Sequence, residues 1–202
     1  MKTRIILIAI MTFSLSAFCQ YNQRDFVKSY YYTPDGEKVE GYILFKEGKL
    51  SGFTGLKPSH IKFKKDIDSK PIELTANEVS SFIVYKDSFA IIQNANIKYE
   101  CGMNTMSDIC IKDFAKVILT GKINAYLYYS RVNLGTYGVH YNEEIVLSKD
   151  NIKYQSFFLK KQKNEFAEFI ADNEKLKEYI LSTKHKDIAI LDVISQYNNA
   201  SR

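Results

Sequence analysis

The chain has 202 residues, of which 46% are hydrophobic and 25% charged, and its formal net charge is +5, all typical of a globular protein with a sizeable core. The composition excludes a disordered or collagen-like chain, and the length excludes a large multidomain enzyme. Aromatic residues reach 14%, with 15 Tyr, 13 Phe and no Trp, a mixture that favours strands over helices.

The amino terminus has the features of a signal peptide. A short positively charged segment precedes an apolar run over residues 5–18, which is shorter than the roughly 20 residues of a membrane-spanning helix. The small residues Ala17 and Cys19 stand three and one positions before Gln20, which suits cleavage after Cys19. We therefore predict a signal peptide over residues 1–19 and an exported protein, periplasmic or extracellular, that begins at Gln20.

An alternative processing route makes Cys19 the lipid-modified first residue of a lipoprotein. That cleavage needs a small residue directly before the cysteine, whereas this chain has the bulky Phe18. A lipid anchor on Cys19 is therefore the alternative to simple export. No transmembrane segment is expected in the mature chain, because no second apolar run is long enough to span a bilayer.

The mature chain is only mildly basic. Without Lys2 and Arg4 it has 26 basic and 23 acidic residues, a net charge of +3. Nucleic-acid binding needs dense basic clusters, and the densest here are residues 62–65 and 160–163. We interpret them as solvated faces of a strand or a helix, so we predict no nucleic-acid partner.

The first part of the mature chain is predicted to consist of strands. Residues 26–32 and 39–45 are rich in aromatic and β-branched residues, and the turn Thr33-Pro34-Asp35-Gly36 between them predicts a hairpin. Further strands are expected over residues 61–64, 82–85 and 89–92, with a short helical turn at the capping box Thr75-Ala76-Asn77-Glu78.

Two cysteines remain in the mature chain, Cys101 and Cys110. In an exported protein an even pair predicts a disulfide, and residues 102–109 between them have the small polar character of a loop. We therefore predict a loop closed by a disulfide between Cys101 and Cys110. Two buried thiols are the alternative, and a metal site is not expected because no His or second Cys pair stands at ligand spacing.

The pattern changes from strands to helices along the second half. Strands are expected over residues 114–119, 123–129, 144–147 and 152–159, with a tight turn at Gly121. From residue 164 onward apolar residues recur at helical spacing and predict three short helices. Asp172 or Asn173 is the expected N-cap of the second helix, and Asp187 that of the third.

These elements predict an α+β fold. A strand-rich antiparallel region should cover residues 20–160, and a C-terminal cap of about three short helices should cover residues 161–202 of the same domain.

Several segments together carry a resemblance to other proteins. They are residues 35–43, 72–82 and 114–128, the leader that ends before Gln20, and the helical tail that closes on Tyr197-Asn198. In these features the chain resembles uncharacterised exported proteins of Bacteroidetes-type bacteria over most of its mature length. The resemblance implies export and supplies neither an activity nor a catalytic residue.

Enzyme motifs are missing from the sequence. It contains no G-x-G-x-x-G, P-loop, G-x-S-x-G, H-E-x-x-H or EF-hand loop. We interpret His60, His140 and His185 as surface or packing residues, and the neighbours Glu143 and Glu144 point to opposite faces of a regular strand. We therefore predict no catalytic residue, no cofactor and no metal.

Tyrosines are the remaining functional candidates. Tyr30-Tyr31-Tyr32 and the strand positions Tyr126 and Tyr128 can present stacking surfaces to sugars or peptides, because a Tyr ring combines apolar area with a polar tip. Packing positions in the core or under the helices are the alternative. We predict a non-catalytic exported or envelope protein that binds a protein or glycan partner, with Tyr126 and Tyr128 as a candidate ligand surface. The alternative function is a hydrolase whose composite site is not visible as a motif.

Overall fold

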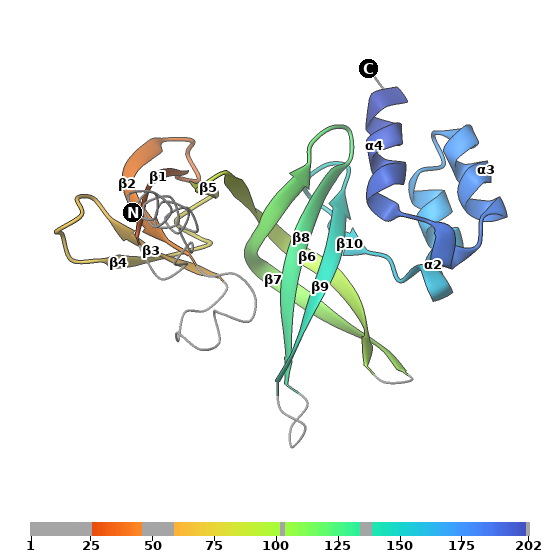
Figure 1. The fold of residues 1–202 in the computed structure, drawn as a ribbon, viewed down its shortest axis with the longest axis horizontal. Helices are drawn as coiled ribbons and strands as arrows, with labels where there is room; N and C mark the ends of the chain where they lie inside the picture. The colour runs from red at the N-terminus through yellow and green to blue at the C-terminus, as the bar shows by residue number, and fades with distance from the viewer. Residues whose placement is uncertain (1–25, 46–58, 102–103, 134–138, 201–202) are drawn as a thin grey trace, which may run out of the picture.

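The computed structural model describes residues 26–45, 59–101, 104–133 and 139–200, and these residues form ten strands followed by three α-helices. The strands join in one mostly antiparallel sheet of order β10-β9-β8-β7-β6-β5-β1-β2-β3-β4. Figure 1 shows three parts in a row: the N-terminal strands, the long central strands and the C-terminal helices. The prediction of a strand-rich antiparallel fold with helices after the strands is confirmed at this level.

The first five strands form the N-terminal end of the sheet. The predicted hairpin is present, with Gly36 in the left-handed region at φ 86° and its N–H donating to the carbonyl of Thr33. The predicted capping-box turn also forms, and the Glu78 carboxylate accepts a hydrogen bond from the backbone N–H of Thr75 at 2.8 Å. The strand bounds are β1 Val27–Tyr32, β2 Lys38–Leu44, β3 His60–Lys64, β4 Ile72–Thr75 and β5 Ser81–Val84.

An aromatic core covers one face of this N-terminal sheet. The rings of Phe82 and Phe89 are stacked with centroids 4.9 Å apart, and Phe114 meets Phe82 edge-on at 5.0 Å. Gly41 lies directly under the Phe63 ring, with which a Cβ atom at this position would collide. The sheet therefore needs glycine at this position of β2, beside its partner β3.

Two long strands lead from the N-terminal sheet into a barrel. They are β6 (Asp87–Cys101) and β7 (Asn104–Leu119), and they pair with each other along their length. The first residues of β6 also pair with β5, whereas Asn96 further along β6 pairs in parallel with Gln155. One strand thus takes part in both halves of the sheet.

Five strands close on themselves to form the barrel. Besides β6 and β7 they are β8 (Asn124–Asn133), β9 (Val139–Ser148) and the short β10 (Gln155–Ser156), which contacts both β9 and β6. Asn94 in the middle of β6 has φ 49°, in the left-handed region, and the buried positions change register there. The buried side chains of the interior are Ile92, Ala95, Ile97, Cys110, Ala115, Tyr126, Val146 and Tyr154.

Two predictions for the central strands are wrong. Residues 104–109, expected in a loop, belong to β7, because the ladder with β6 satisfies their backbone polar groups although most of their side chains are polar. Residues 102 and 103 of that expected loop lie outside the described residues. The strand expected over residues 152–159 is reduced to β10, and a helix begins at Leu159.

The helices pack on the outside of the barrel as a helical cap. They are α2 (Leu159–Phe169), α3 (Glu174–Ser182), the 3-10 helix η2 (His185–Asp187) and α4 (Ile190–Ala200), and their buried side chains share a core with Ile123, Ala125 and Leu147. Asn173 caps α3 as predicted, accepting from the N–H of Leu176 at 3.2 Å. Asp187 does not cap α4, because it lies in η2 and α4 begins at Ile190.

A buried amide fastens the last helix to the barrel. The side chain of Asn198 accepts a hydrogen bond from the N–H of Ile123 and donates one to its carbonyl, both at 2.9 Å. The amide thus pairs with Ile123 as a neighbouring strand would. A Cβ atom at Gly121 would overlap this amide, so the β7–β8 turn and α4 fit together only with glycine there.

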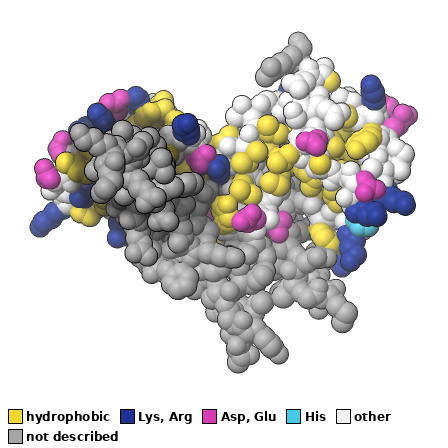
Figure 2. Space-filling view, in the orientation of Figure 1, with side chains coloured by type: hydrophobic (Ala, Val, Ile, Leu, Met, Phe, Trp, Pro, Cys, Tyr) yellow, Lys and Arg dark blue, Asp and Glu magenta, His cyan; other side chains and the backbone are white. Residues whose placement is uncertain are grey.

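The described surface is divided by side-chain type. On the face drawn in Figure 2, Lys side chains gather at the two ends of the molecule and hydrophobic side chains gather in its middle. Within the described ranges, no helix has the length and apolar character needed to cross a bilayer.

Candidate functional site

Tyr126 and Tyr128 belong to the interior of the barrel. Tyr126 is 5% exposed, its ring lies 5.8 Å from that of Tyr154, and its hydroxyl donates to the Asn151 side chain at 2.9 Å. Tyr128 is half-buried, and its hydroxyl donates to Asp113 at 3.2 Å. Both rings therefore pack against other barrel strands, and not under the helices, which cover the opposite face of β8.

The two cysteines are not brought together by the hairpin. The ladder pairs Cys101 with Asn104 and Cys110 with Ala95, so the cysteines lie six positions apart along it. At about 3.3 Å per strand residue this is roughly 20 Å, whereas the Cα atoms of a disulfide lie within about 7 Å. The predicted disulfide does not fit this register. Cys110 is buried in the barrel interior.

Two carboxyl groups also lie in the barrel, Asp113, which the sequence analysis did not single out, and Glu144. Asp113 is 8% exposed and accepts a hydrogen bond from the N–H of Phe114 at 2.7 Å, and burial raises its pKa to about 6. Glu144 pairs with Tyr128 across β8 and β9, and burial raises its pKa to about 7. Burial likewise raises the pKa of the Tyr128 hydroxyl. The raised values have one main cause, loss of water around each group.

Replacing Asp113 by asparagine is expected to stabilise the protein at neutral pH. The folded carboxyl keeps its proton up to about pH 6, whereas the ordinary pKa is 3.8, so wild-type stability falls as the pH rises through this window. The difference between the ordinary pKa and the raised pKa corresponds to roughly 3 kcal/mol. Chemical unfolding of the variant and the wild type at about pH 4 and at about pH 7 measures the difference between their free energies of unfolding.

Asparagine keeps an acceptor for the N–H of Phe114 and has no charge to bury. The advantage of the variant should therefore grow between the two pH values, and comparison with the wild type cancels the contribution of Glu144, which acts in the same direction. An advantage that does not change with pH would contradict the assignment of the raised pKa to Asp113.

An open face with aromatic and basic side chains lies on the N-terminal sheet. Directly opposed residues in antiparallel strands project from the same face. The register places Tyr42 between Lys28 and Lys64, and Tyr32 beside Lys38. These five residues, with Tyr30, form a surface that we call the tyrosine face, on the side of the sheet opposite the aromatic core.

The rings on this face contact one another and the lysines. Tyr30 and Tyr32 meet edge-on with centroids 5.6 Å apart, and the ammonium of Lys38 lies 4.2 Å from the centroid of Tyr30. Lys38 also pairs with Glu40 at 2.6 Å, a hydrogen bond that raises the pKa of Lys38 and lowers that of Glu40. Tyr32 is 36% exposed, and Tyr30 and Tyr42 are half-buried.

The tyrosine face combines three kinds of contact in one surface. Its rings supply apolar area, its hydroxyls supply hydrogen-bond donors and acceptors, and its lysines supply positive charge. Tyr30 and Tyr32 were visible in the sequence as part of a tyrosine run. Tyr42 and the lysines were not singled out with them, because only the pairing of β1, β2 and β3 brings them alongside.

Comparison with known proteins adds no relative. The chain matches no family model, no curated protein and no solved structure. A search of the described residues for three or more His, Cys, Asp or Glu side chains able to hold a metal ion found no such group.

Proposed function

We propose that the protein is a non-catalytic exported protein that binds a glycan through its tyrosine face. The observation that supports this most strongly is the cross-strand arrangement of Tyr30, Tyr32 and Tyr42 among lysines on the sheet face opposite the aromatic core. Sugar rings present flat apolar patches edged with hydroxyls, and tyrosine complements both features. Export rests on the predicted signal peptide over residues 1–19.

A rigid sheet suits this task. Tyr30 and Tyr32 are held from behind, because Tyr31 between them packs into the core against Phe63 at a centroid distance of 5.0 Å. The rings therefore lose little conformational freedom when a ligand binds, which favours affinity.

The barrel interior gives less support to the alternative hydrolase. It does gather Cys110, Asp113 and Tyr128, which are chemically capable groups. Asp113 and Cys110 are each 8% exposed, however, and their surroundings are the apolar core of the barrel. Little of either side chain is open to a substrate, so a role in structure fits these groups better.

Affinity electrophoresis tests the proposed binding. Native gels that contain soluble xylan, dextran or solubilised peptidoglycan are expected to retard the wild type in at least one case. The double variant Tyr30→Ala/Tyr42→Ala should bind that polymer at least about tenfold more weakly, because two stacking contacts are lost. Its melting temperature should change little, because both rings lie on the outer face of the sheet.

Tyr179→Ala is the matched control, because Tyr179 is an exposed tyrosine on α3, far from the sheet face. It should migrate like the wild type in every gel. The proposal fails if none of these polymers retards the wild type, or if the double variant and the control lose retardation equally.

A further inference from the structure

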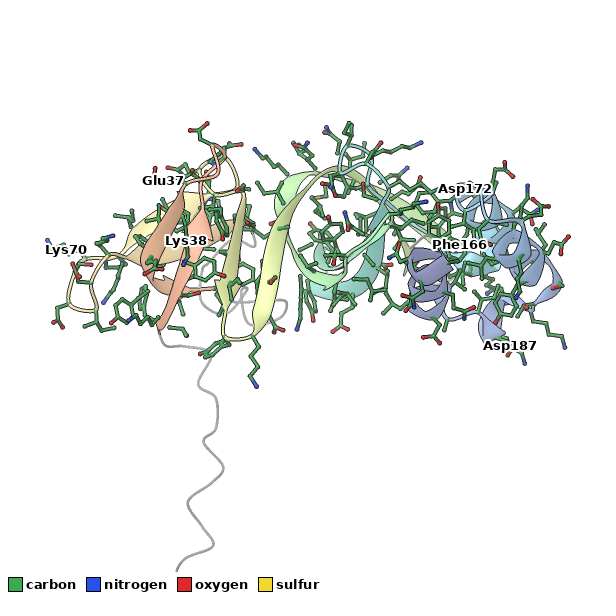
Figure 3. The ribbon with its side chains drawn as sticks, turned by 90° about the horizontal axis from the view of Figure 1, so that it is seen from above. Glu37, Lys38, Lys70, Phe166, Asp172 and Asp187 are labelled. Atoms are coloured by element: carbon green, nitrogen blue, oxygen red, sulfur yellow. The ribbon has the colours of Figure 1, made fainter. Side chains whose placement is uncertain are left out.

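A second feature lies at the opposite end of the molecule, in the helical cap. A pocket of about 250 Å³ opens between the start of α2 and η2. We call it the lysine pocket, and its lining residues are Leu159, Lys160, Lys163, Lys184, His185 and Lys186. Figure 3 shows the distance between the two ends, with Lys38 on the N-terminal sheet and Asp187, the last residue of η2, at the far side of the cap.

Hydrogen bonds from one lysine hold the two sides of the pocket together. The ammonium of Lys163 donates to the carbonyls of Leu181 at 2.9 Å and Thr183 at 3.2 Å, where α3 ends. Lys160 lies three residues earlier on α2, and its side chain lines the same pocket as Lys163. The chain after Thr183 then places Lys184 and Lys186 on the other side of the same pocket.

The charge of this pocket is not balanced within its lining. The described residues that line it include four lysines and no carboxylate. Lysines at other places around the cap do have acidic partners, since Lys149 in the turn after β9 pairs with Asp172 at 2.8 Å and Lys177 of α3 pairs with Glu168 at 3.1 Å. Like charges held around one cavity repel one another, and an anion in the cavity would convert each repulsion into an attraction.

We propose that the lysine pocket binds a phosphate group, as a free diphosphate or phosphomonoester or as a lipid headgroup. Lysine acts on phosphate as a point charge that needs no fixed bidentate geometry, whereas planar carboxylates are more often matched by arginine. Pockets for drug-sized ligands have volumes of about 300 Å³ or more, so this smaller volume suits a compact anion. The site is separate from the tyrosine face and does not depend on glycan binding.

Titration with inorganic pyrophosphate, followed by backbone amide NMR of the full chain, tests the site. Saturable shifts are expected at residues 159–163 and 184–186. The double variant Lys160→Gln/Lys184→Gln should weaken binding at least about tenfold, because two charge-assisted contacts are lost. Lys163 is left unchanged, because it also holds the end of α3.

The matched control is Lys161→Gln/Lys175→Gln, which removes the same charge from exposed positions on α2 and at the start of α3, outside the pocket lining. It should retain wild-type affinity. If the two double variants lose affinity equally, the binding reflects general charge and the proposal is wrong.

A second arm separates the two sources of phosphate. Sedimentation with phosphatidylcholine vesicles, with and without phosphatidic acid, is compared for the wild type and the two double variants. Binding to phosphatidic acid that depends on the pocket lysines, without binding of pyrophosphate, identifies a lipid headgroup as the ligand. Binding of pyrophosphate alone identifies a soluble ligand. Absence of both overturns the proposal.

Discussion

Replacing Asn198 by alanine is expected to lower the free energy of unfolding by about 3–5 kcal/mol. The substitution leaves the backbone N–H and carbonyl of Ile123 without the two hydrogen bonds that the amide supplies. Asn198 is 9% exposed, so water replaces these partners poorly. A loss of this size is a large fraction of the 5–15 kcal/mol that stabilises a typical domain. Chemical denaturation measures it.

The neighbouring exposed residue provides the control. Asn199→Ala lies on the same helix and should change stability by less than about 0.5 kcal/mol. Gly121→Ala should also be destabilising, because its methyl group would overlap the Asn198 amide. The double variant should lose less stability than the sum of the losses in the two single variants, since alanine at position 198 removes that overlap. Equal midpoints for Asn198→Ala and the wild type would contradict this account of the contact.

Tyr126→Ala is expected to cost about 3–5 kcal/mol, the range of a buried aromatic residue cut back to alanine. The ring packs in the barrel interior against Tyr154, and a close-packed interior relaxes only partially into the space that a removed ring leaves. Thermal and chemical unfolding both report the loss. Any weaker ligand binding by this variant should follow the unfolded fraction.

Tyr126→Phe separates packing from hydrogen bonding. It keeps the ring and loses the hydroxyl with its hydrogen bond to Asn151, so its cost should be about 1 kcal/mol. If Tyr126→Ala instead stays as stable as the wild type and loses binding specifically, Tyr126 acts as a ligand surface and its place in the barrel core has been misjudged.

Local signals in the sequence predicted local structure well. Pro34 and Gly36 fix a turn by their own backbone preferences, and the Asn173 cap acts within three residues of itself. In each case the interaction that determines the structure is formed between neighbours in the chain.

These local signals could not predict contacts between residues that are far apart in the sequence. The pairing of Asn96 with Gln155 closes the barrel, and neither residue has a strong strand preference. Residues 104–109 have mostly polar side chains and form a strand because β6 lies opposite them. Residues 152–159 are as apolar as a strand requires. Most of their apolar side chains instead pack against the barrel or lie at the start of α2.

The same limit applies to the candidate sites. Lys160 and Lys184 are far apart in the sequence, and only the packing of α2 against α3 and η2 places them around one pocket. The basic run at residues 160–163 therefore had the composition of an ordinary solvated helix face. The sequence around Asp113 does not indicate that this residue is buried. Its burial accompanies the change of register at Asn94, and no recognisable pair of turn residues encodes that change.

Closure of the barrel by β10 has a consequence for the order in which the chain folds. Strands β1–β5 lie within residues 27–84 and pair with one another, so the N-terminal sheet can form while the rest of the chain is still being synthesised or exported. The second half of β6 has no partner on its β10 side until Gln155 emerges 59 residues after Asn96. During that interval β6 presents an open edge, which is the kind of edge that recruits strands from other molecules. Two residues at the end of the sheet thus decide how long the nascent barrel is exposed to aggregation.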